Sequence, residues 1–234
     1  METTIDHRVE LRPPQVTAWT TLRVWPARGL ARSTALLLAP GAGSNFDEPV
    51  LSALATGLSA RGLVVGTFDF AYRNAGRRAP DPRERLERAF HDVLATFVDV
   101  ARARHHVLGG RSLGGRMATH LAAAGAGAGV VALAYPLHPR GRPDPRRTAH
   151  WPDIKVPLLF VHGDRDHMCP VTALDAARST RLRNTASTAH VVAGADHGFA
   201  LAARDARTSA DVRAELIAAV DGWVTRTFEE GEHG

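Results

Sequence analysis

The sequence predicts an α/β protein in which a mostly parallel central sheet is flanked by helices. Apolar runs of strand length alternate with helical patterns, which is typical of successive β-α-β units. The 234 residues are 44% apolar and 23% charged, the composition of a globular domain. A chain of this length can bury a layered core, so we expect a single domain over residues 1–234, with its core over about 20–228 and flexible ends.

Short, mainly apolar runs predict the strands. A strand buried on both faces of a parallel sheet needs no alternation of polar and apolar residues. In chain order the predicted strands are Leu22–Trp25, Thr34–Ala39, Leu63–Phe70, His105–Gly109, Val130–Tyr135, Val156–His162 and Ala189–Ala193.

Helical patterns lie between these runs. They cover Glu48–Ala60, the segment after Asp81-Pro82, Met117–Ala124, Val171–Ser179 and a last helix from about Thr208. In the second of them, apolar residues recur on one face from Leu86 to Phe97, and we expect Asp81 to cap the helix with Pro82 in its first position. At the last helix, Thr208 and Asp211 can form a capping box.

The longest stretch without a pattern is Pro136–Lys155, which is rich in Pro, Arg and His. Such a loop in a compact domain is more often an active-site lid than slack chain. As a cap over an active site this stretch is short, so we expect little or no cap domain and an open site that suits small substrates.

The composition argues against several kinds of site. Cys169 is the single cysteine, so the chain can form neither an intrachain disulfide nor a cysteine cluster for zinc or iron–sulfur. The histidines are scattered, without the spacing of zinc ligands. We therefore expect no metal and no organic cofactor. Cys169 itself is expected to fill space near the site rather than to act as a nucleophile.

The sequence shows no pattern that indicates a membrane-spanning segment or a signal peptide. The longest apolar runs, such as Val130–Leu137, are far shorter than a bilayer span, and Met1–Pro14 has no apolar signal-peptide region. We therefore expect a cytoplasmic protein with no membrane partner.

The chain is basic, with a net charge of +5 and a pI of about 10.5, which raises the question of a nucleic-acid partner. All the basic residues except Lys155 are arginines, and they are spread along the whole chain. The two local clusters, Arg77–Arg88 and Arg140–Arg147, are interrupted by acidic residues and prolines and lack aromatic residues for base stacking. We expect no nucleic-acid partner, and the oligomeric state stays open.

One motif indicates nucleophilic catalysis. Gly110-Arg111-Ser112-Leu113-Gly114 has the pattern G-x-S-x-G, follows a predicted strand and precedes a predicted helix. This is the strand, tight turn and helix that a nucleophile elbow requires, and the glycines allow the sharp turn. Ser112 is therefore the candidate nucleophile.

A serine hydroxyl needs a base, and the base needs a carboxylate to orient it. Asp166 follows one predicted strand and His197 follows the next, so both are expected at the sheet edge that carries Ser112. Asp164 is the first replacement for Asp166 if that assignment fails. Asp196, next to the histidine, is expected to be a turn residue.

The loop after Thr34–Ala39 is expected to stabilise an oxyanion. The backbone N–H groups of Ala42 and Leu113 are the candidate donors. Gly41 and Gly43 allow the main chain to approach a substrate closely. Arg111 either faces the site and attracts an anionic group or is a solvated arginine, and the sequence leaves both readings open.

These motifs resemble those of the α/β-hydrolase superfamily, from about Thr34 to Phe228. The chain is most similar to the dienelactone-hydrolase-like subgroup, on the stretches APGAGSNFDEP, GGRSLGGRMA, YPLHPRGRP and VHGDRDHMCP. Eukaryotic relatives of that subgroup include a testis-expressed protein and a non-catalytic subunit of a histone acetyltransferase complex.

The resemblance implies an α/β-hydrolase fold and assigns the acid to Asp166 and the base to His197. Pro40 stands where most relatives have histidine. Dienelactone hydrolases use cysteine where this chain has Ser112, so a dienelactone substrate is not implied.

We expect a serine hydrolase of the carboxylesterase or thioesterase type, with a triad of Ser112, Asp166 and His197 and a small-molecule acyl substrate. Acyl transfer to an acceptor other than water is a second enzymatic reading. The alternative from another class is a catalytically silent scaffold that acts as a protein-interaction module.

Overall fold

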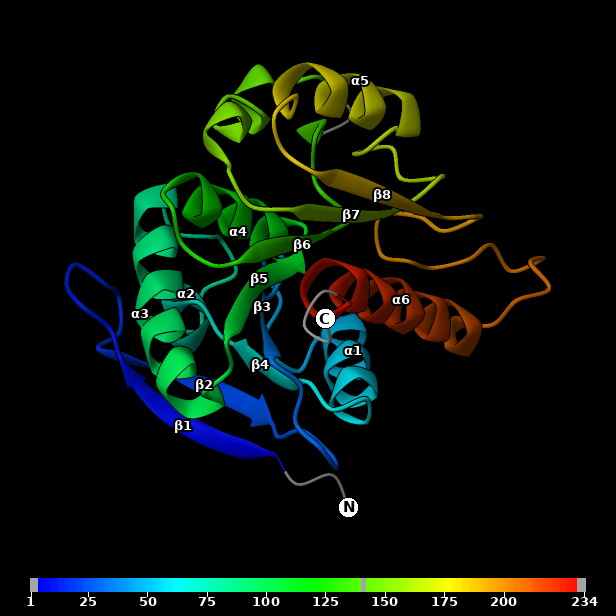
Figure 1. The fold of residues 1–234 in the computed structure, drawn as a ribbon. Coiled ribbons are helices and arrows are strands. Elements are labelled where there is room, and N and C mark those ends of the chain that lie inside the picture. Colours follow the sequence, from blue (N-terminus) through cyan, green and yellow to red (C-terminus); the bar gives the residue numbers. More distant parts are fainter. Residues whose placement is uncertain (1–3, 140–141, 231–234) are drawn as a thin grey trace.

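Eight strands form one sheet in the order β1-β2-β4-β3-β5-β6-β7-β8 (Figure 1). The structure is a computed structural model that describes residues 4–139 and 142–230. The strands are β1 Ile5–Glu10, β2 Trp19–Trp25, β3 Thr34–Ala39, β4 Val64–Phe68, β5 His105–Arg111, β6 Gly129–Leu133, β7 Leu158–Gly163 and β8 Ser187–Val192. The β1–β2 and β2–β4 pairs are antiparallel, and every other pair is parallel. The predicted α/β class is confirmed.

Helices cover both faces of the sheet (Figure 1). They are α1 Pro49–Ser59, α2 Ala71–Asn74, α3 Arg83–Ala101, α4 Leu113–Ala123, α5 Val171–Arg181 and α6 Ser209–Val224, followed by a π-helical turn at Thr225–Glu229. The side chains of β3 alternate between two cores. Leu37 packs in the cluster with α3, α4 and α5, whereas Leu36 and Leu38 pack in the cluster with α1 and α6.

The sheet begins earlier than the sequence predicts, because β1 starts at Ile5 and the core was expected from about residue 20. Only Val9 of β1 is buried, and charged residues make up half of the strand. An edge strand of this kind has no apolar run, so its pattern resembles a loop. The expected flexible ends fall mainly on residues 1–3 and 231–234, which lie outside the described residues.

The helix starts differ from prediction in two places. Helix α3 begins at Arg83 with Pro82 as its N-cap, and Asp81 forms an ion pair with Arg77 instead of capping the helix. Helix α4 begins at Leu113, earlier than the predicted Met117. The prediction missed the first turn because it contains two glycines and has no apolar period. The predicted capping box of Thr208 and Asp211 is present at α6.

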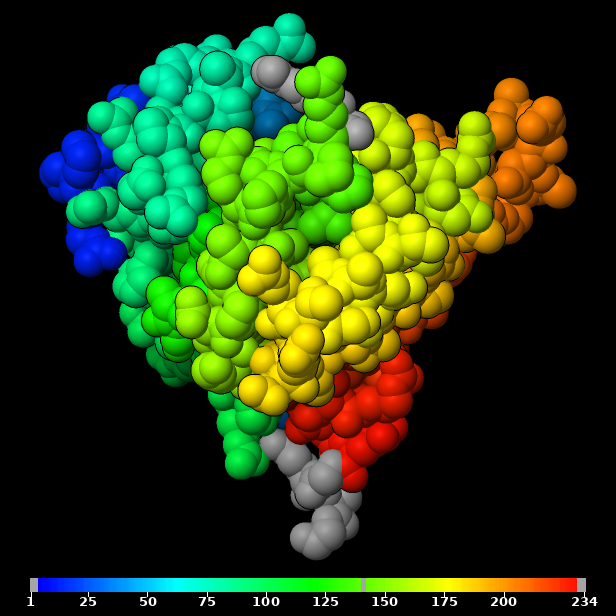
Figure 2. All heavy atoms as spheres, turned by 90° about the horizontal axis from the view of Figure 1, so that it is seen from above, coloured from blue at the N-terminus to red at the C-terminus, as the bar shows by residue number. Residues whose placement is uncertain are grey.

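The segment between β6 and β7 forms no separate cap domain in the part that the structure describes. It contains two 3₁₀ turns, Pro145–Arg147 and Trp151–Asp153, and its Trp151 is fully buried. In Figure 2 this lime-green segment lies between the start of α3 and α5. Within the described ranges no helix is long and apolar enough to cross a membrane.

Candidate active site

The turn that carries Ser112 is built by close packing of β5 and α4 against the end of β3. Ser112 has φ 51° and ψ −109°, between the last residue of β5 and the first residue of α4. A Cβ added at Gly114 would lie 2.0 Å from the backbone oxygen of Ala39, and one added at Gly110 would lie 2.2 Å from it. The two glycines are therefore required for this approach, which holds Ser112 in its unusual backbone conformation.

Ser112, His197 and Asp166 form a continuous chain of hydrogen-bonding side chains. His197 Nε2 lies 3.0 Å from Ser112 Oγ, and His197 Nδ1 lies 2.8 Å from Asp166 Oδ2. Because a carboxylate only accepts, the Nδ1–H group donates to Asp166, and Nε2 is left as the acceptor for the serine hydroxyl. Ser112 follows β5, Asp166 follows β7 and His197 follows β8, so the three reach the same edge of the sheet.

Burial and hydrogen bonds fix the position of the Asp166 carboxylate. The side chain of Asp166 is fully buried, and its second oxygen, Oδ1, accepts the Met168 N–H at 2.8 Å. The imidazole of His197 is one-fifth exposed. The carboxylate is thus fixed from two sides, while the ring stays accessible at the surface where a substrate would arrive.

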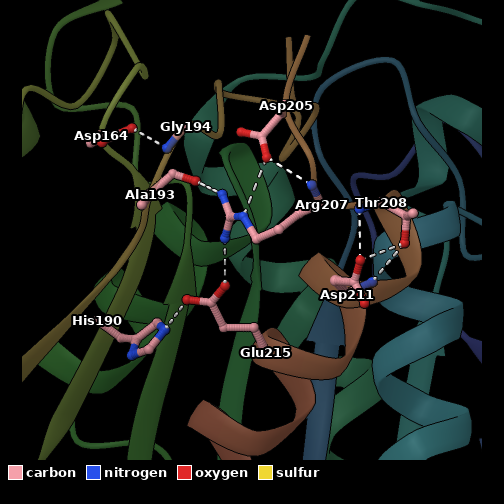
Figure 3. Close-up of polar contacts among 9 residues, drawn as sticks. All are labelled: Asp164, His190, Ala193, Gly194, Asp205, Arg207, Thr208, Asp211 and Glu215. Atoms are coloured by element: carbon pink, nitrogen blue, oxygen red, sulfur yellow. Dashed lines mark hydrogen bonds and ion pairs between the residues drawn. The ribbon is translucent and has the colours of Figure 1, made fainter. Parts of the chain in front are cut away.

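The two remaining aspartates of these loops have other partners. Asp164 Oδ1 accepts the Gly194 N–H at 2.7 Å, which ties the loop of the acid to the loop of the histidine (Figure 3). Asp196 accepts the N–H groups of Gly198 and Ala200, as expected for a turn residue. Neither carboxylate takes the place of Asp166 beside the imidazole.

A polar network braces the segment that carries His197 (Figure 3). The Arg207 guanidinium donates to the backbone oxygen of Ala193 and, at 3.3 Å, to Glu215 of α6. Glu215 also contacts the His190 ring of β8 at 2.8 Å. The loop between β8 and α6 is thereby fastened at both ends, which limits how far the imidazole can move.

Removing the tie made by Asp164 is expected to loosen the relay. Asp164→Ala loses the acceptor for the Gly194 N–H, whereas Asp164→Asn keeps an oxygen there. We expect the alanine variant to lose about 1 kcal/mol in the free energy of unfolding and to react several-fold more slowly with a fluorophosphonate, because the histidine loop is less well held. Labelling rates and thermal melts of the two variants check this. Equal behaviour of both would contradict it.

The loop after β3 is held by hydrogen bonds to Asp69 and Tyr72, which follow β4. Gly43, at φ 72°, donates its N–H to Tyr72 Oη at 3.1 Å, and Phe46 donates its N–H to Asp69 Oδ1 at 2.7 Å. Gly43 therefore does not offer its N–H to a substrate. For the N–H of Ala42, the described part of the chain contains no hydrogen-bond acceptor.

The second candidate donor lies at the start of α4. Leu113 is the first residue of the helix, and the N–H groups of a first turn have no partner within the helix. They also carry the positive end of the helix dipole. The α4 start packs against the end of β3, so this donor and the Gly41–Ser44 turn belong to the same wall of the site.

Asp69 makes stability depend on pH. Burial raises the pKa of Asp69 to about 6, against a partial offset from the Phe46 N–H. Since the unfolded chain loses this proton at a lower pH than the folded one, the free energy of unfolding falls as pH rises from about 4 to 6 and is then level. The ionised folded form is the less stable one.

Asp69→Asn removes that ionisation and keeps an oxygen for the Phe46 N–H. We expect the variant to exceed the wild type by about 1–3 kcal/mol in the free energy of unfolding at pH 7.5, with little difference at pH 4. Urea titrations at the two pH values measure this. The same difference at both values would mean that the carboxyl group titrates normally.

Arg111 lies beside the site rather than in bulk solvent. Its Nε lies 3.2 Å from Glu48 Oε1, and its Nη1 makes a long 3.5 Å contact with the backbone oxygen of His197. Its Nη2 would lie 3.3 Å from a Cβ at Gly41. The guanidinium therefore spans the loop after β3 and the histidine loop. The buried carboxylate of Glu48 offsets its charge, which weakens the case for an anion at this arginine.

Three of these residues escaped the sequence analysis. Glu48, Asp69 and Tyr72 position the loop after β3, yet no motif spacing marks them. Asp69 and Tyr72 follow β4 at the same sheet edge as Ser112, but the predicted strand Leu63–Phe70 included Asp69, so only the position of Tyr72 after a predicted strand was an available signal.

Cys169 and His162 are buried near Asp166 and Asp175. Cys169 is fully buried, and burial raises the pKa of its thiol to about 12, so the reactive thiolate is negligible at neutral pH. His162 is almost fully buried, and burial lowers its pKa, which keeps the ring neutral. Both behave as packing residues.

Comparison with known proteins gives a match to one family model and to several solved structures. Residues 32–225 match the family model described as an alpha/beta hydrolase domain. The structure of an α/β serine hydrolase without lid from Xanthomonas campestris is 21% identical, covers 94% of each chain and has a TM-score of 0.71.

Two further solved structures extend the similarity. A dienelactone hydrolase from Anabaena variabilis is 17% identical, with 96% of this chain and 98% of that chain covered and a TM-score of 0.67. A thermostable carboxyl esterase from Bacillus coagulans is 11% identical, with 96% and 99% covered and a TM-score of 0.74. At these identities the likeness is one of fold, and it extends over almost the whole chain.

Proposed function

The chain belongs to the α/β-hydrolase domain family, and from this premise we propose that it is a serine hydrolase that cleaves a carboxylic ester or thioester through an acyl-enzyme. The observation that carries the proposal is the relay of Ser112, His197 and Asp166, with contacts of 3.0 Å and 2.8 Å. The unusual backbone of Ser112 supports it, because strain of this kind is typical of active sites.

In the proposed first half-reaction, Ser112 Oγ attacks the acyl carbon while its proton passes to His197 Nε2. The imidazolium that forms is stabilised by the buried carboxylate of Asp166. The proton then moves to the leaving alcohol or thiol as the bond to the acyl carbon breaks, and the acyl group remains on Ser112.

The second half-reaction uses the same groups with water as the nucleophile. His197 takes a proton from water as the hydroxide attacks the acyl carbon. The bond from the acyl carbon to Ser112 Oγ then breaks, His197 returns the proton to Oγ, and the carboxylic acid leaves. In both tetrahedral intermediates, the N–H groups of Ala42 and Leu113 stabilise the oxyanion, and one such donor contributes about 3–4 kcal/mol in other serine hydrolases.

Arg111 acts in this scheme as a positioning residue. Its contacts with Glu48, Gly41 and the His197 backbone keep the oxyanion loop and the histidine loop at a fixed separation. It forms no bond to the reacting atoms in the mechanism.

A fluorophosphonate probe tests the proposal directly, since it reacts with an activated serine without the need to know the substrate. We expect one adduct, located at Ser112 by peptide mass spectrometry. A panel of p-nitrophenyl esters of increasing chain length and a panel of acyl-CoA thioesters then define the acyl and leaving groups, and added alcohols or amines reveal acyl transfer. A protein that takes no label and turns over no member of either panel would be a silent scaffold.

A further inference from the structure

A basic cleft of about 500 Å³ lies outside the triad, where the start of α3, the first turns of α4 and the β6–β7 segment meet. Arg83 of α3, Arg116 and His120 of α4, and Arg147 and His150 of the β6–β7 segment line it. Its volume is in the range of small-molecule sites in proteins. None of these side chains takes part in the proposed hydrolysis.

The positive charges in the cleft exceed the negative ones. Four arginines line it, against a single carboxylate, Asp144, which lies 2.8 Å from Arg146 and 3.4 Å from Arg147. Arg83 pairs with Glu84 and Glu87 on its own helix, at 3.1 Å and 3.5 Å. One carboxylate is thus shared by two arginines of the β6–β7 segment.

Asp144 and Glu87 interact with the charge of Arg116 from beyond ion-pair distance. Within residues 4–139 and 142–230, no carboxylate lies within ion-pair distance of its guanidinium. Burial, followed by the charges of Arg147 and Arg83, lowers the pKa of Arg116. Holding a half-buried guanidinium beside other cations costs free energy in the empty site, and an anion in the cleft would remove this cost.

Two stacked imidazoles close one side of the cleft. The rings of His120 and His150 lie 3.6 Å apart, with an angle of 14° between their planes. Burial lowers the pKa of His120 to about 3 and that of His150 to about 4, so both rings are neutral at pH 7. Glu87 faces His120 at 3.4 Å, and burial raises the pKa of that carboxyl group. The wall therefore adds no further cation, and the arginines alone make the cleft positive.

We propose that this cleft binds the phosphate group of a small molecule. Guanidinium groups present planar pairs of N–H donors that match phosphate oxygens, and here Arg83, Arg116 and Arg147 surround one cavity. The site rests on these arginines, so it stands independently of the role of Ser112.

Arg116, which lines the cleft, lies one helical turn after Ser112. The Arg116 N–H donates to the backbone oxygen of Ser112 at 3.0 Å, and side chains of a helix lean toward its N-terminus, which here is the end that carries Ser112. A phosphate in the cleft can therefore belong to the substrate itself or to a separate ligand that binds beside it.

Titration calorimetry with inorganic phosphate tests the site. The wild type is expected to bind with a Kd of about 1 mM or below, and Arg116→Gln to bind at least about tenfold more weakly. Arg181→Gln, which removes an exposed arginine of α5, is the matched control and should bind like the wild type. Arg147→Gln is a second variant with the same expectation as Arg116→Gln, and thermal melts establish that each variant is folded.

Kinetics distinguish the two sources of the phosphate. One acyl group is offered on a phosphorylated alcohol and on the same alcohol without phosphate. If the phosphate belongs to the substrate, kcat/KM is higher for the phosphorylated compound by about tenfold or more, and Arg116→Gln abolishes this preference. If it belongs to a separate ligand, the two compounds react equally and inorganic phosphate changes the rate for the uncharged one.

Phosphate binding that weakens in both cleft variants supports the site even if no ester is hydrolysed. The test of the phosphate site is therefore independent of the test of the proposed function. A wild type that binds no phosphate at about 10 mM overturns the inference. So does equal binding by Arg116→Gln, Arg147→Gln and Arg181→Gln.

Discussion

Ser112→Ala is expected to abolish fluorophosphonate labelling and to lower kcat for the best ester or thioester by about 10⁴- to 10⁶-fold. The variant removes the only protein atom that attacks the acyl carbon in the proposed mechanism, so no acyl-enzyme can form. The oxyanion donors and the binding surface remain, so a small residual rate above that in water should persist.

The matched control is Ser179→Ala, because Ser179 is an exposed serine on α5, remote in sequence from the elbow. It should keep wild-type labelling and kcat. Both proteins should melt like the wild type, since loss of one hydroxyl removes little buried contact. Full esterase activity in Ser112→Ala would exclude the acyl-enzyme mechanism.

Gly114→Ala is expected to have the largest effect on stability. Its Cβ would lie 2.0 Å from the backbone oxygen of Ala39 and 2.9 Å from that of Pro40, and neither atom can move without shifting the end of β3. We expect a loss of about 3 kcal/mol or more in the free energy of unfolding, which corresponds to a fall in Tm of about 6–12 °C. Because α4 would be displaced from β3, labelling of Ser112 should also fall sharply.

Gly222→Ala is the matched control, as another glycine inside a helix. There the Cβ would meet the far end of the Arg226 side chain at 3.1 Å, and that end can move away. Alanine is the better helix former, so this variant should equal the wild type or gain up to about 1 kcal/mol. Differential scanning calorimetry compares the three proteins. Equal Tm values for both variants would show that α4 tolerates a wider separation from β3.

The sequence predicts the parts of this fold that depend on local patterns. The apolar run Thr34–Ala39 and the capping box at Thr208 lie where they were expected, because each is fixed by neighbouring residues. The strand Ile5–Glu10 could not be found in this way, since its place depends on pairing with β2 and only one of its side chains is buried.

The same distinction applies to the site. The elbow around Ser112 is a local motif, and the placement of Asp166 and His197 follows from the order of the strands, although their catalytic roles stay predictions. The contacts of Tyr72 with Gly43 and of Arg111 with Glu48 join segments far apart in sequence, so no pattern along the chain indicates them. The basic cleft likewise depends on the packing of three distant segments.

The three residues of the proposed triad all follow the ends of strands, whereas β3 and β6 consist entirely of buried residues. Exposed positions in the segments after β6 and β8 can therefore change without altering the buried residues that hold the sheet together. For the proposed hydrolase, a library limited to those exposed positions, with Trp151, Ile154 and His197 kept, would sample new acyl or leaving groups on an unchanged framework.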